Sequence, residues 1–91
     1  MMLSDFFVSV IDMFGKDIFN LIFVKNRAQM VVYARCIVAY YLNTKLQYRH
    51  WQIAEYLNQP RSTITVYLTK YHDWYKYNEK FRNLADKVLK E

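Results

Sequence analysis

Residues 51–70 read WQIAEYLNQPRSTITVYLTK, and this stretch decides the fold. Its first part carries apolar residues at the spacing of a helix with one buried side: Trp51, Ile53, Ala54 and Leu57. Its second part repeats that spacing: Ile64, Tyr67 or Leu68, Tyr71 and Tyr75. Between them, Asn58-Gln59-Pro60 interrupts the pattern, and Pro60 suits the first turn of a new helix because it has no N–H and a preset φ. The stretch therefore predicts two helices, 49–57 and 60–76, joined by a tight turn.

The second helix begins with residues that suit contact with a ligand better than they suit a core: Arg61, Ser62, Thr63 and Thr65. Two helices joined by a tight turn are typical of a helix-turn-helix, whose second helix enters the DNA major groove and reads bases with its first residues. Ser and Thr hydroxyls contact phosphates and base edges in such helices. The alternative is that Ser62 and Thr63 only cap the helix.

The composition favours one all-α domain, residues 1–91, built as a small helical bundle. Ninety-one residues are enough to bury a core, and 54% hydrophobic with 19% aromatic residues exclude a disordered chain. One Gly and one Pro leave little of the turn chemistry that a sheet protein of this length requires.

The formal charge of +5 is unevenly distributed along the chain. Residues 1–24 contain one basic and three acidic side chains, whereas residues 25–91 contain twelve basic and five acidic ones. Between Lys25 and Lys70, Glu55 is the only acid against seven Lys or Arg. A basic block of this kind suits a polyanion, most often nucleic acid; the alternative is a soluble surface that happens to be basic.

Residues 3–24, LSDFFVSVIDMFGKDIFNLIFV, are apolar enough to be compared with a signal peptide or a membrane span. The charged residues Asp5, Asp12, Lys16 and Asp17 exclude both interpretations. Polar residues instead recur every three or four positions, as one narrow stripe on a helix: Asp5, Ser9, Asp12, Lys16 and Asn20. We therefore expect one long apolar helix over 3–24, with Ser4 as its N-cap and Gly15 weakening its middle slightly.

A helix this apolar needs cover on nearly all sides, and the remaining residues form too small a bundle to supply it. We therefore expect self-association through residues 3–24, as a two-fold homodimer. The alternative is an intramolecular core helix. Binding flat on a membrane is disfavoured because the polar stripe is acidic, where anionic lipid attracts Lys or Arg.

Two further helices complete the predicted bundle. In the first, residues 27–43, Arg27 and Arg35 lie about 80° apart around the helix axis and so share a face. On spacing alone, that face is solvated. Asn78 suits the N-cap of a last helix, 79–90. The packing side of this helix is expected to contain Phe81, Leu84, Ala85, Val88 and Leu89.

The chain contains no pattern that predicts catalysis, a metal site, a cofactor or a small-molecule substrate. One glycine cannot build a phosphate loop, and His50 and His72 lack ligand spacing to a third metal ligand. No Ser or Cys has an evident base and orienting group. The single Cys36 cannot form an internal disulfide, which fits a reducing cytoplasm, and its apolar neighbours favour a buried hydrophobe over a reactive thiol.

Two short motifs resemble a known family. Ala34-Arg35-Cys36-Ile37-Val38-Ala39-Tyr40 and, at the family's spacing, Ile53-Ala54 are similar to the C-terminal DNA-binding domain of the bacterial chromosomal replication initiator DnaA. The resemblance covers about residues 27–90 and implies a Trp-repressor-like fold. After Ile53-Ala54 the turn is one residue shorter, and residues 60–64 fall on the family's Asp-His-Thr-Thr-Val.

The resemblance implies contacts to double-stranded DNA at particular positions. Arg61, Ser62 and Thr63 would begin the recognition helix. Arg27 falls on the family's minor-groove Arg, and Arg35 falls on the Arg of its basic loop. Gln59 falls on a family Arg beside the helix, and Arg49 and His50 fall on the phosphate-contacting connection. Thr65 is a candidate through its hydroxyl group and not through the resemblance.

The family's Asp-His pair is replaced by Pro60-Arg61, so its characteristic base contacts do not carry over. We expect a non-enzymatic, sequence-specific DNA-binding protein that acts in replication or transcription control. A two-fold dimer would favour palindromic half-sites about one helical turn apart. The alternative is a protein-interaction module that keeps this fold and binds a host or replisome protein. Its surface would be aromatic: Tyr33, Tyr41, Tyr48, Tyr67, Trp74 and Tyr77.

Overall fold

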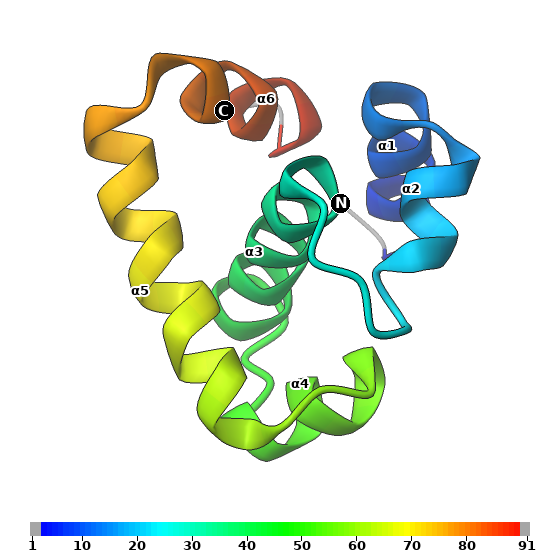
Figure 1. Ribbon diagram of the computed structural model, residues 1–91, viewed down its shortest axis with the longest axis vertical. Helices are drawn as coiled ribbons and strands as arrows, with labels where there is room; N and C mark the ends of the chain where they lie inside the picture. The colour runs from blue at the N-terminus through cyan, green and yellow to red at the C-terminus, as the bar shows by residue number, and fades with distance from the viewer. Residues whose placement is uncertain (1–2, 90–91) are drawn as a thin grey trace.

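The computed structural model describes residues 3–89, which form six α-helices and no strand (Figure 1). The helices are α1 (Leu3–Phe14), α2 (Lys16–Leu21), α3 (Gln29–Thr44), α4 (His50–Leu57), α5 (Arg61–Tyr77) and α6 (Glu79–Leu89). The predicted all-α class is therefore confirmed. None of these helices is both long and apolar enough to cross a membrane.

Helix α3 forms the centre of the bundle, and each of the other five helices contacts it (Figure 1). Ten of its sixteen residues are buried, including the run from Tyr33 to Ala39. Helix α5 packs along α3, and the two are joined by a stacked pair of rings, Tyr40 and Tyr71, with centroids 3.9 Å apart. The bundle therefore presents α5 as an outer helix with one side on the core.

The prediction of one long helix over residues 3–24 is wrong, because the helix ends at Phe14. Gly15 adopts φ 90° and ψ 155°, a conformation that glycine alone adopts readily, and α2 begins after it. Helix α2 ends at Leu21, and the chain then runs without helix to Ala28. Ser4 lies inside α1, which begins at Leu3, rather than preceding it as an N-cap.

Helix α1 buries its apolar face within the protomer. Phe6, Val10 and Phe14, spaced by four, are buried, and α1 contacts both α3 and α6. The ring of Phe6 stacks on Tyr41 of α3, with centroids 3.8 Å apart and planes within 4° of parallel. The intramolecular alternative therefore accounts for this face, while Val8 remains 57% exposed. Self-association through residues 3–24 stays a prediction.

Helices α4 and α5 form the predicted pair, with bounds within one residue of those expected. The turn between them depends on Asn58, which takes the left-handed conformation with φ 54° and ψ 45°. Asn tolerates this conformation better than most residues. The following N–H of Gln59 donates to the carbonyl of Ala54 at 3.0 Å, closing the end of α4.

The expectation that Trp51 is buried is wrong, because its side chain is 47% exposed. Ile53 and Leu57 define the buried side of α4, and Trp51 lies about 200° around the helix from Ile53. At the other end of the bundle, the predicted N-cap of α6 is confirmed. Asn78 Oδ1 accepts a hydrogen bond from the N–H of Phe81 at 3.0 Å.

Candidate nucleic-acid interface

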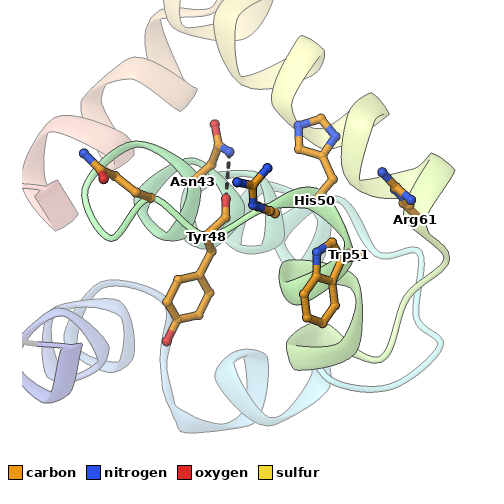
Figure 2. A pocket seen from close by; sticks show the side chains of 7 residues that line it. Asn43, Tyr48, His50, Trp51 and Arg61 are labelled. Atoms are coloured by element: carbon orange, nitrogen blue, oxygen red, sulfur yellow. Dashed lines mark hydrogen bonds between the residues drawn. The ribbon is translucent and has the colours of Figure 1, made fainter.

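The first half of α5 lies between two surface hollows. The first hollow is lined by the α3–α4 connection, the start of α4 and Arg61 (Figure 2). The second consists of two adjoining pockets between the α2–α3 segment and α5, lined by Lys25, Arg27, Ser62, Thr63 and Lys70 among others. Successive residues turn by about 100° around a helix, so Arg61 and the Ser62–Lys70 side of α5 face opposite directions.

Hydrogen bonds between the residues around the first hollow fix its shape. Asn43 Nδ2 donates to the carbonyl of Tyr48 at 3.0 Å (Figure 2), and the N–H of Arg49 donates to Gln52 Oε1 at 2.8 Å. His50 Nδ1 lies 3.3 Å from Thr65 Oγ1, so these two candidate residues hydrogen bond to one another across α4 and α5. The side chains of Arg49 and Arg61 are exposed at its rim.

The second hollow combines exposed cations with hydroxyl groups. Lys25 and Arg27 come from the non-helical segment between α2 and α3, and both are exposed. Across from them, Ser62 is exposed and Thr63 is partly buried at the start of α5. The α2–α3 segment therefore brings Arg27 beside the first turn of α5, although the two lie more than thirty positions apart in the sequence.

The expectation of one solvated face for Arg27 and Arg35 is wrong, because Arg35 is only 2% exposed, although both residues line the second hollow. The guanidinium of Arg35 lies under the α2–α3 segment, and its hydrogen bonds account for all five of its N–H groups. Nε donates to Ile22 O (3.0 Å), Nη2 to the carbonyls of Leu21 (3.1 Å) and Val24, and Nη1 to Asn26 O (2.6 Å) and Tyr67 Oη (3.4 Å). No donor of Arg35 is left for a phosphate in this structure.

Gln59 is also partly engaged inside the protein. Its side-chain amide donates to the carbonyl of Val24 at 3.3 Å and to that of Leu57 at 3.4 Å. Val24 is therefore held from two directions, by Arg35 and by Gln59. Among the other candidates, Arg27, Arg49, Arg61, Ser62 and Thr65 are exposed, and His50 and Thr63 are partly buried.

The two hollows form a positive surface. Five exposed basic residues line them, and no Asp or Glu does: Lys25, Arg27, Arg49, Arg61 and Lys70. Lys25, Lys70 and Trp51 were not among the predicted site residues. Helical spacing places Trp51 on the open side of α4, since Ile53 and Leu57 define the buried side. The position of Lys25 depends on the path of the α2–α3 segment, which no local pattern indicates.

Three of the six aromatic residues expected on the surface of a protein-interaction module are buried instead. Tyr33, Tyr41 and Tyr67 are 2%, 3% and 6% exposed. Tyr33 also accepts hydrogen bonds from Gln29 and Asn78, so its hydroxyl is used inside the bundle. Of the six aromatic residues expected there, only Tyr77 is largely exposed, at 78%.

Residues 3–89 contain no group of three or more metal-ligating side chains. Cys36 is fully buried, and desolvation raises the pKa of its thiol to about 12. Nearby Lys70 and Arg35 lower this pKa by less than burial raises it. The thiol is therefore protonated and inert at neutral pH, as a small buried hydrophobe.

No family model matches the chain, and neither a curated protein nor a solved structure does. The resemblance to the replication initiator thus rests on the residues quoted above.

Proposed function

We propose that this protein binds double-stranded DNA without catalysing a reaction, and that α4 and α5 act as a helix-turn-helix. In this proposal the first half of α5 enters the major groove, and Arg61, Ser62 and Thr65 face the bases or the adjacent phosphates. The resemblance to the initiator domain supports a role in replication or transcription control. We further propose a homodimer through residues 3–24, which would read a palindromic site.

One observation carries the proposal most directly. Five exposed cations from three separate parts of the chain surround the first half of α5, and no acid lines the same hollows. A duplex presents two phosphate strands on either side of its major groove, so an inserted helix needs positive charge on both sides. Arg49 lies in one hollow and Arg27 in the other, which fits that requirement.

The test is a binding titration with a fluorescein-labelled duplex recovered by selection from a random pool. Arg61→Ala is expected to weaken binding by about 1–3 kcal/mol, roughly 5- to 150-fold, if Arg61 contacts a base. If it contacts a phosphate, the log–log salt slope should fall by about one. The matched control is Lys80→Ala on α6, which removes an exposed charge at the other end of the bundle (Figure 1).

Binding that is equally weakened by Arg61→Ala and Lys80→Ala would show only a general charge effect and would reject the assignment of α5. A wild-type chain that selects no sequence, and whose affinity does not fall with salt, would reject DNA binding itself.

A further inference from the structure

The α2–α3 segment, residues 22–28, is anchored at its start, where Ile22 is fully buried and Phe23 packs against the core, but its residues from Val24 onward bury little apolar surface. It has no helical hydrogen-bond ladder, and it carries two exposed cations of the second hollow, Lys25 and Arg27. Val24 in its middle is 47% exposed, so burial of apolar side chains contributes little there. Hydrogen bonds to its backbone therefore contribute most to fixing the path of the segment beyond Phe23.

One buried side chain supplies several of those bonds. Arg35 donates to the carbonyls of Leu21, Ile22, Val24 and Asn26, so its guanidinium covers the end of α2 and reaches the residue before Arg27. Carbonyl groups at the end of a helix have no partner within it, and a guanidinium with five fixed donors suits them. Gln59, in the turn before α5, adds a second donor to Val24.

We propose that Arg35 is a positioning residue, which sets the place of Arg27 beside the first turn of α5 and does not contact DNA itself. The inference rests on the proposed DNA-binding function. Tyr67 Oη, on α5, also accepts from Arg35, so one guanidinium joins the α2–α3 segment to the recognition helix. Arg27 and α5 thus keep a fixed spacing, as two contacts to one duplex require.

The test is a double-mutant cycle with Arg35→Lys and Arg27→Ala, measured with the fluorescein-labelled duplex. Lysine keeps the charge but presents one ammonium in place of the planar fork, so it cannot reach all of these carbonyls. Arg35→Lys should weaken binding about tenfold in the wild-type background and less than about twofold in the Arg27→Ala background. An equal loss in both backgrounds would overturn the proposal, because it would show that Arg35 acts independently of Arg27.

A second measurement, made without DNA, separates this inference from the proposed function. Amide hydrogen exchange in residues 22–28 should accelerate at least about tenfold in Arg35→Lys, while the amides of α5 stay protected. If Arg35→Lys does not fold, Gln59→Ala removes the other donor to Val24 and should accelerate the same amides by a smaller factor. Unchanged exchange in these variants would overturn the positioning role. A wild-type chain that binds no duplex would instead reject the proposed function and leave the exchange result standing.

Discussion

The rings of Phe6 and Tyr41 lie parallel, 3.8 Å apart, and join α1 to the central helix α3. Phe6 is fully buried, so Phe6→Ala removes a whole aromatic side chain from the core. We expect it to lower the free energy of unfolding by about 3–5 kcal/mol, measured by urea denaturation of the purified protein. Val8→Ala on the same helix, where Val8 is 57% exposed in the protomer, should change the unfolding free energy of the monomer by less than about 0.5 kcal/mol.

The same experiment tests the partner of α1. If α1 is covered only within its own protomer, the denaturation midpoint will not depend on protein concentration, and the homodimer proposed through residues 3–24 is rejected. A midpoint that rises with concentration, with a large effect of Val8→Ala, would show that α1 is covered by a second copy.

Gly15 separates α1 from α2, and its conformation gives a second prediction. A Cβ at this position would meet no atom within 4 Å, so Gly15→Ala causes no steric clash with neighbouring groups. Its φ of 90° with ψ of 155° is nevertheless unfavourable for alanine, and we expect destabilisation of about 1–3 kcal/mol in urea denaturation. Asn20→Ala, on the exposed side of α2, is the control and should be nearly neutral.

If Gly15→Ala instead raises stability and helix content, then α1 and α2 form one continuous helix. That outcome would restore the structure expected from the sequence of residues 3–24, since alanine favours a helix interior by about 1 kcal/mol over glycine.

The break at Gly15 shows why the sequence predicted that residues 3–24 contain helix but did not predict where the first helix ends. The narrow polar stripe that begins at Asp5 and Ser9 predicted a helix here, and the structure contains one whose apolar side is buried at Phe6, Val10 and Phe14. A glycine inside such a pattern is compatible with either a continuous helix or an interruption, because its local penalty is only about 1 kcal/mol. Packing of α2 against α3 and α1 decides between them, and that packing depends on residues far along the chain.

Cys36 gives a prediction about pH. Burial raises the pKa of its thiol to about 12 from an ordinary value of 9.0, so the unfolded chain loses this proton at a lower pH than the folded one. The resulting stability is fully present below pH 9 and is lost as the pH rises from there towards 12. Between pH 8 and pH 10 the wild type should lose about 1 kcal/mol through this group.

Cys36→Ala is the matched control for the thiol, because it leaves every other titratable side chain in place. Its unfolding free energy should fall less over this interval than that of the wild type. A thiol reagent at pH 8 should react with Cys36 only after denaturation; rapid reaction with the folded protein would contradict a buried, protonated thiol.

The sequence predicted the positive charge of the candidate site and the two helices that form it, but not the role of every residue in it. At helical spacing Arg27 and Arg35 would lie on one face, yet Arg27 is exposed and Arg35 is only 2% exposed. The difference arises because Arg35 lies on the inner side of α3 while Arg27 precedes that helix in the α2–α3 segment. Helical spacing cannot represent a segment that folds over a helix and covers its arginine with backbone carbonyls.

Trp51 gives a prediction that locates bound DNA without altering a charge. It is 47% exposed in the first hollow, beside Arg49 and Arg61, whereas Trp74 packs edge-on against Tyr33 and Phe81 towards the other end of α5. Trp74→Phe leaves Trp51 as the only tryptophan, and Trp51→Phe leaves Trp74. DNA is expected to lower acrylamide quenching of Trp51 about twofold or more, because a duplex over the hollow would exclude solvent from the indole.

In the matched variant, quenching of Trp74 should remain nearly constant on addition of the same duplex, because this ring is already packed between two others. Protection of Trp74 with no change at Trp51 would place DNA on the second half of α5 and would contradict insertion of its first turn. The protection of Trp51 should also decrease as salt is raised, in parallel with the affinity for DNA. This result would link the protection to phosphate contacts, because counterion release makes such contacts salt-dependent.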